Sequence, residues 1–160
     1  KATLEAAGII ANGMKRPNYQ SDPVKTRSID ARLDLARSWW PYAAEYEAAI
    51  KPAPGAVKSK LLSQGVVAVG LVTFCYQPAE ARAFWAGLAE NDGLRKGDPR
   101  HTLLVDLLNR QMNHGGSNQA VVTASLAWNA WLGRRPLKII KVYAGAAVRI
   151  AGTPFDGRRR

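Results

Sequence analysis

Apolar positions recur at helical spacing near the start of the chain. The first stripe consists of Leu4, Ala7, Ile10 and Met14. Because side chains three or four residues apart lie on one face of an α-helix, this stripe predicts a short helix that ends near Gly13. The segment that follows, KRPNYQSDP, contains two prolines and several turn-forming residues, and it therefore predicts a loop.

A second helical stripe begins after Ser28, whose hydroxyl suits the N-cap position of a helix. Its apolar members are Ile29, Leu33, Ala36 and Trp40. Pro41 has no backbone N–H to donate, so we expect it either to kink this helix or to begin a second one.

The middle of the chain contains its strongest break and its most apolar run. Residues 51–58, KPAPGAVK, hold two prolines and a glycine, which predicts a loop inside one domain. Residues 60–76, KLLSQGVVAVGLVTFCY, suit a buried strand by their valine content and a buried helix by their length. We predict a helix, in which Gly65 and Gly70 each cost about 1 kcal/mol unless they permit close packing.

Proline and glycine mark the limits of the remaining helices. Pro78 suits the first position of a helix that ends at the NDG turn, near Gly93. Asp98 is the expected cap of the next helix, which an NHGG segment closes. Ser117 is the expected cap of the last helix, and Gly133 is its expected end.

The residues beyond position 133 lack a helical stripe and are rich in β-branched residues and glycine. We expect an extended tail, with a short β-hairpin that turns at residues 143–146 as one alternative. The sequence thus predicts a mainly α fold: a single compact bundle of about six to seven helices over residues 1–133. A basic, partly extended C-terminal tail over residues 134–160 is expected to pack on the bundle or to project from it.

The charge balance changes this picture more than the rest of the composition does. The 160 residues suit one domain, and 47% hydrophobic and 22% charged residues are ordinary for a globular protein. However, 23 Lys and Arg residues against 12 Asp and Glu residues give a formal charge of +11. From Arg134 onward, eight basic residues stand against one acid, so this tail carries +7 of the +11. A polyanion is therefore the first partner to consider.

Cysteine usage and hydropathy bear on the compartment. The single cysteine, Cys75, excludes an internal disulfide and suits a reducing environment. The apolar centre of the longest uncharged run, residues 66–76, is too short to cross a bilayer. The chain does not open with a signal-peptide pattern. We expect a cytoplasmic protein with no membrane segment.

Catalytic and cofactor chemistry find little support in the residue pattern. Catalysis by Cys75 would need a nearby histidine, and the candidates are His101 and His114. The cysteine lies in the most apolar run, where a buried, inert thiol is expected. One cysteine and two widely spaced histidines do not make a zinc site, and phosphate-loop and dinucleotide-binding motifs are absent from the sequence. We therefore expect no metal and no cofactor. The nearest carboxylates, two of which suit turn and cap positions, are Asp92, Asp98 and Asp106.

Two tryptophans precede the basic end of the chain. Trp128 and Trp131 share a helix face, and we expect a core role for them, with base stacking by exposed rings as the alternative. The cations beyond them cannot all be buried without partners, and few acids lie near them in sequence. The residues predicted to contact phosphates in this tail are Arg134, Arg135, Lys138, Lys141 and Arg149.

A second basic group surrounds the GDP turn at residues 97–99. The start of the following helix would add backbone N–H donors for a phosphate there. The predicted phosphate-binding residues of this group are Arg95, Lys96 and Arg100.

Three segments, taken in order, resemble a known family. They are KATLEAAGII at residues 1–10, EARAFWAGLAENDGLRKGDPRHTLLVDLLNR at 80–110 and LAWNAWLGRRPLKIIK at 126–141. They are similar to the helical C-terminal region of ParB-like proteins of phages, plasmids and mobile elements. In that family a ParB/sulfiredoxin-like domain precedes the helical region, and its DGQHR-like segment is absent from these residues. The resemblance implies a helical, DNA-associated accessory region and brings no active site with it.

The patterns together predict a non-enzymatic accessory domain that holds duplex DNA by phosphate contacts, and RNA stays open as a target. One alternative is a protein-interaction or homo-oligomerisation module, in which tryptophan-bearing helices pack against a second copy or a host protein. A nuclease has the least support, because the sequence offers no constellation of metal ligands or nucleophile and base.

Overall fold

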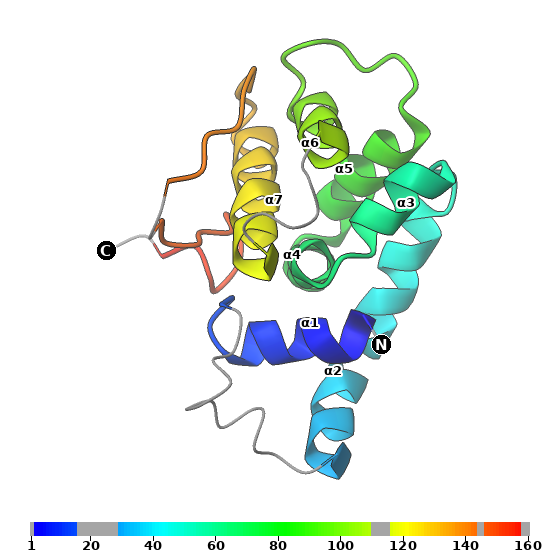
Figure 1. The fold of residues 1–160 in the computed structure, drawn as a ribbon, viewed down its shortest axis with the longest axis vertical. Helices are drawn as coiled ribbons and strands as arrows, with labels where there is room; N and C mark the ends of the chain where they lie inside the picture. Colours follow the sequence, from blue (N-terminus) through cyan, green and yellow to red (C-terminus); the bar gives the residue numbers. More distant parts are fainter. Residues whose placement is uncertain (1, 16–28, 110–115, 144–145, 158–160) are drawn as a thin grey trace.

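The computed structural model describes residues 2–15, 29–109, 116–143 and 146–157. Within these ranges the chain forms seven helices and no strand, so the mainly α prediction is confirmed (Figure 1). The helices are α1 (Ala2–Ala11), α2 (Ile29–Ile50), α3 (Gly55–Leu61), α4 (Gln64–Tyr76), α5 (Pro78–Glu90), α6 (Pro99–Asn109) and α7 (Gly116–Leu132).

Helix α4 forms the centre of the bundle. Its sequence is apolar on every side, and all ten residues from Gly65 to Phe74 are buried. Such a helix needs partners all round, and α4 contacts α1, α2, α5 and α7. Figure 1 shows it nearly end-on, with α1 on one side and α7 on another. Helices α1, α2, α5 and α7 therefore enclose α4.

A glycine on α4 allows α2 to approach closely. A Cβ added at Gly70 would lie 2.5 Å from Cδ2 of Tyr46, so only the absence of a side chain leaves room for that ring. The Tyr46 hydroxyl donates to the Leu61 carbonyl oxygen at 2.6 Å, and burial raises the pKa of Tyr46 well above its ordinary value. The close packing expected at Gly70 is therefore present, and the tyrosine it admits also ties α2 to the end of α3.

Aromatic rings connect α4 to the helices after it. Trp85 on α5 is fully buried and donates from its indole nitrogen to the Thr73 hydroxyl at 3.0 Å. Phe84 lies between Trp85 and Trp128, with ring centroids 4.8 and 5.6 Å away in edge-on geometry. Because Trp128 is also fully buried, its predicted core role is confirmed.

The predicted helix over residues 60–76 is interrupted. Helix α3 ends at Leu61, α4 begins at Gln64, and the two are bent by 74°. Ser63 has an extended backbone, with φ −64° and ψ 142°, and its carbonyl oxygen accepts a hydrogen bond from Val67 N. Ser63 is thus the N-cap of α4, a role that the sequence prediction overlooked. The predicted loop over 51–58 is correspondingly too long, because α3 begins at Gly55.

No single helix among the described ranges has the length and apolar character to span a bilayer. The bent pair α3 and α4 meets those two criteria only when its members are taken together.

Most other helix limits agree with the prediction. Helix α2 continues through Pro41, so of the two expectations for this proline the second helix is wrong. Pro78 opens α5, and Asn91 ends it in the left-handed conformation. Gly116 opens α7, so Ser117 lies inside that helix and not at its cap. The expected cap Ser28 and most of the NHGG segment lie outside the described residues.

The described part of the C-terminal tail packs on α7 and does not project. Trp128 donates from Nε1 to the Ala151 carbonyl oxygen at 2.9 Å. Asn129 donates to the Arg149 carbonyl oxygen at 2.9 Å and accepts from Ala151 N at 2.8 Å. Ile150 is fully buried, which adds an apolar anchor. The hairpin alternative turns at residues 143–146, of which 144 and 145 lie outside the described residues, and the described residues beside them form no strand.

Replacing Gly70 by alanine tests the contact between α2 and α4. The added methyl group would overlap the Tyr46 ring, so the ring or the helix must shift. We expect Gly70→Ala to lower the free energy of unfolding by about 1–3 kcal/mol, the usual cost of overpacking a core, in spite of alanine's better helix propensity. Urea unfolding monitored by circular dichroism measures this change.

Gly55→Ala is the matched control, because nothing lies within 4 Å of a Cβ added at that first residue of α3. Its stability should be unchanged or slightly higher. If Gly70→Ala were as stable as this control, the close approach of α2 to α4 would be wrong.

Candidate nucleic-acid interface

Two hydrogen bonds bring together the two basic groups that the sequence singles out. The loop between α5 and α6 and the residues after α7 lie side by side, because Leu137 N donates to the Gly97 carbonyl oxygen at 2.9 Å. The Thr102 hydroxyl on α6 donates to the Leu137 carbonyl oxygen. Figure 1 shows both segments at the same end of the molecule. Cations far apart in sequence therefore share one region of the surface.

The local sequence explains why both segments turn toward each other. Gly93 and Gly97 have φ values of +68° and +100°, which L side chains rarely adopt, so these glycines shape the α5–α6 loop. Arg134 follows α7 and has a left-handed backbone, with φ +55°, which ends the helix. Pro136 then prevents the helix from resuming, because it has no backbone N–H to donate. The chain therefore leaves α7 abruptly and runs across the start of α6.

Arg100 is held inside the fold by an acid and a ring. Its guanidinium donates to both Asp98 carboxylate oxygens, at 2.8 and 3.1 Å, and to the Ala83 carbonyl oxygen at 3.2 Å. The same group lies 4.4 Å from the Trp131 ring centroid, and only 19% of the side chain is exposed. A Cβ added at Gly87 on α5 would lie 2.2 Å from Nη1 of Arg100, so the absence of a side chain at Gly87 leaves room for this arginine. Arg100 therefore stabilises the bundle and is not part of a free phosphate-binding surface.

The start of α6 is likewise already capped. Arg100 N donates to the Asp98 carboxylate at 2.9 Å. The side-chain hydrogen bond from Arg100 is the largest of the influences that lower the pKa of Asp98. The sequence predicts that the backbone N–H groups at this helix start bind a phosphate. The N–H group of Arg100 is already used by the Asp98 carboxylate.

Arg134 and Arg149 also have acidic partners within the chain. Arg134 Nη2 lies 2.7 Å from the Glu80 carboxylate, and its guanidinium lies 5.5 Å from the Trp131 ring centroid. Arg149 donates to the Asp156 carboxylate at 2.9 Å and to the Asp156 carbonyl oxygen at 2.7 Å. Their charges are therefore partly balanced inside the protein. The sequence does not indicate the Arg134–Glu80 pair, because Glu80 lies on α5, 54 positions before Arg134.

The other five predicted cations are exposed and form no ion pair with a carboxylate of a described residue. We call them the basic strip: Arg95, Lys96, Arg135, Lys138 and Lys141. Arg95 and Lys96 precede Gly97 directly, and Arg135 and Lys138 flank Leu137, so the Leu137–Gly97 hydrogen bond draws four of the five together. Lys141 follows along the same segment. The strip retains a net positive charge that the described residues do not neutralise.

Neither tryptophan before the strip offers a free face for a base. Trp128 is buried in the core. Trp131 is partly buried and has two guanidinium groups near its ring. Its indole nitrogen is buried and has no hydrogen-bond partner among the described residues. The alternative in which these rings stack on bases therefore lacks a free surface.

The structure exposes two apolar side chains that the sequence argument did not select. The backbone bends at Lys138, and beyond this bend outward and inward residues alternate. Ile139 and Tyr143 are 64% and 70% exposed, whereas Ile140 is buried. Simple alternation from the partly buried Leu137 would turn Ile139 and Lys141 inward, whereas both are exposed. No residue type in the PLKIIK stretch indicates the bend that reverses them.

The residues considered for catalysis do not assemble in the described chain. Cys75 is half-buried near the end of α4, and a hydrogen bond with it raises the pKa of Tyr42. The thiol is therefore less buried than the sequence predicts. His101 is half-buried in the first turn of α6, and His114 lies outside the described residues. Among the described residues, no three His, Cys, Asp or Glu side chains gather into a group that could hold a metal ion.

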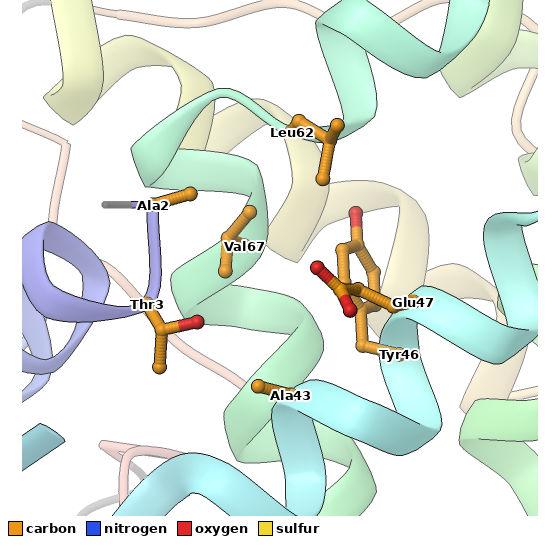
Figure 2. Close-up of a pocket in the computed structure, with 7 residues that line it drawn as sticks. All are labelled: Ala2, Thr3, Ala43, Tyr46, Glu47, Leu62 and Val67. Carbon is orange, nitrogen blue, oxygen red and sulfur yellow. The ribbon is translucent and has the colours of Figure 1, made fainter. Parts of the chain in front are cut away.

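A small pocket elsewhere on the molecule is mostly apolar. Small and apolar side chains of α1, α2 and the start of α4 line it, and Figure 2 shows Glu47 beside Tyr46 at one wall. Of the described residues that line it, Glu47 alone is charged. The pocket lies between α1, α2 and the junction of α3 with α4, and none of the predicted phosphate-binding residues lines it.

Replacing Asp98 by asparagine tests the Asp98–Arg100 pair, because asparagine keeps the cap but removes the charge. We expect Asp98→Asn to lower the free energy of unfolding at neutral pH by about 1 kcal/mol. The pKa of Asp98 is lowered in the folded state, so its stabilising effect is complete above the ordinary carboxyl pKa of about 3.9. The effect is lost as the pH falls through the lower, folded-state value, and the two proteins should then converge. Urea unfolding at a series of pH values measures the difference.

Asp34→Asn provides the control, because the Asp34–Arg37 pair is 70% exposed on both sides and should contribute under about 0.5 kcal/mol. A difference between wild type and Asp98→Asn that stayed constant below pH 3 would contradict the lowered pKa.

Comparison with protein-family models, with curated proteins and with solved structures gives no match to this chain. The resemblance to ParB-like proteins therefore stays a prediction.

Proposed function

We propose that this chain is a non-enzymatic nucleic-acid-binding domain that contacts phosphates through the basic strip. The observation that carries the proposal is the Leu137–Gly97 hydrogen bond, which joins two basic segments into one region. Uncompensated cations on adjoining loops attract a chain of phosphates, because several ion contacts release several counterions at once. The resemblance to ParB-like proteins agrees with DNA as the polyanion.

The strip suits recognition of charge more than recognition of sequence. Its members lie on segments without regular secondary structure, whereas readout of base edges in a groove ordinarily uses a helix or strand that enters that groove. Arginine can bind a phosphate with two hydrogen bonds, and lysine acts as a point charge. Binding to duplex DNA should therefore depend steeply on salt and weakly on sequence.

A protein-interaction or oligomerisation module is the second reading, but the tryptophans support it less than the sequence indicates. Trp85 and Trp128 are fully buried in the core, where they cannot contact a partner. Trp40 on α2 is 58% exposed and is the tryptophan that still suits an interface. Size-exclusion chromatography with light scattering, with and without a short duplex, separates the two readings.

Neutralising the strip tests the proposal directly. The variant carries glutamine at four positions: Arg95, Lys96, Arg135 and Lys138. We expect it to bind a short DNA duplex at least tenfold more weakly at low salt. The slope of log affinity against log salt should become shallower by roughly 3 to 4, because each lost phosphate contact removes about 0.9. Fluorescence anisotropy of a labelled duplex over a range of salt concentrations measures both quantities.

A control variant removes the same charge from exposed residues elsewhere: Lys15, Arg37, Lys51 and Arg82. It has the same net charge as the strip variant, so a general effect of charge would weaken both equally. Equal losses in the two variants, or a wild-type protein whose binding does not respond to salt, would overturn the proposal.

A further inference from the structure

The segment after the bend at Lys138 exposes an aromatic ring and an aliphatic side chain between cations. Tyr143 is 70% exposed and Ile139 is 64% exposed, although both side chains are large and largely apolar. Lys138 and Lys141 are exposed beside them. Water thus surrounds an apolar surface and two positive charges on one short stretch of chain.

The inward residues of the same stretch fix it to the bundle. Ile140 is buried, and Val142 packs against the core in a partly buried position. Alternating residues of an extended chain point to opposite sides, so anchoring positions 140 and 142 presents positions 139, 141 and 143 together. The fold therefore fixes the backbone that carries the outward side chains before any ligand binds.

We infer that residues 138–143 bind single-stranded nucleic acid. Tyr143 stacks on an unpaired base, Ile139 contacts a neighbouring base or sugar, and Lys138 and Lys141 contact the flanking phosphates. This inference rests on the proposed function, because it assigns the kind of polyanion that the basic strip receives.

The choice of a single strand follows from what each ligand offers. A duplex presents phosphates but keeps its base faces stacked inside, so it can satisfy the lysines and leave Tyr143 in water. An unpaired strand presents both a charged backbone and flat apolar faces, and base stacking on an aromatic ring tolerates any base. Of the two forms, the single strand therefore matches both the charge and the exposed ring of this segment.

Tyr143→Ala, Tyr143→Phe and the wild type should be compared on oligo(dT), oligo(U) and a duplex of equal length. We expect Tyr143→Ala to weaken binding to the single strands about five- to a hundredfold, the range expected for one lost stack, and to change duplex binding less than twofold. Tyr143→Phe should keep wild-type affinity, since stacking needs the ring and not the hydroxyl. The oligo(dT) and oligo(U) arms distinguish DNA from RNA as the source of the strand.

Trp40→Ala is the matched control, because it removes another exposed ring from α2, which carries none of the basic strip. Its affinity for every oligonucleotide should equal that of the wild type. Anisotropy of labelled oligonucleotides measures affinity, and circular dichroism checks that each variant is folded.

The outcomes separate this inference from the proposed function. If wild type binds duplex and the strip variant does not, while Tyr143→Ala binds single strands as tightly as wild type does, the stacking inference is wrong and the phosphate contacts stand. If wild type binds neither single strands nor duplex, both fail. Tyr143-dependent binding to phosphatidylserine vesicles without binding to any oligonucleotide would overturn the inference in favour of an anionic membrane surface.

Discussion

The burial of residues 65–74 of α4 is the constraint on which the rest of the structure depends. A helix of thirteen residues with no polar face cannot lie at a surface, so four other helices must cover it. The cover is tight where α2 crosses, since the Tyr46 ring occupies the space above Gly70. Once α4 is enclosed, α5 and α7 are placed beside each other, and Phe84 joins the tryptophans of both. The surface at the ends of α5 and α7 follows from that arrangement.

The fold divides the cations at this surface into two kinds. Arg100 and Arg134 lie near the Trp131 ring and pair with Asp98 and Glu80, so they connect α5, α6 and α7. The residues of the basic strip have no such partner among the described carboxylates. Arg100, which is 19% exposed and bonds both oxygens of its acid, contributes to stability, whereas Arg134 is 66% exposed and its charge is only partly balanced. An exposed cation with no acidic partner is available to an external anion. This difference in surroundings, and not residue type, decides which of these cations lack an acidic partner among the described residues.

The sequence predicts the elements of this structure better than their contacts. Pro78 and Asp98 mark helix starts by local chemistry, and both predictions are confirmed. The break at Ser63 was missed although the polar residues Ser63 and Gln64 interrupt the apolar run there. The sequence prediction gave more weight to the length of the run than to this N-cap signal. For the candidate site, the sequence predicts less of what the structure shows. The partner of Arg134 lies on α5, the bend at Lys138 has no residue signature, and the Leu137–Gly97 hydrogen bond joins segments that sequence spacing cannot relate. Pairings over long sequence distances depend on the packing of whole helices, which periodicity does not encode.

The attachment of the tail to α7 affects how the basic end of this protein can be manipulated. Trp128 and Asn129 fix the backbone of residues 149–151, and Ile150 fills a fully enclosed position. A truncation before residue 140 would remove positive charge, but it would also expose the Trp128 indole and the apolar surface that Ile150 covers. Such newly exposed apolar surface favours self-association. The same segment thus carries both the cations and the residues that anchor it to the core. Deleting it changes charge and packing together, whereas replacing single exposed side chains changes the charge alone.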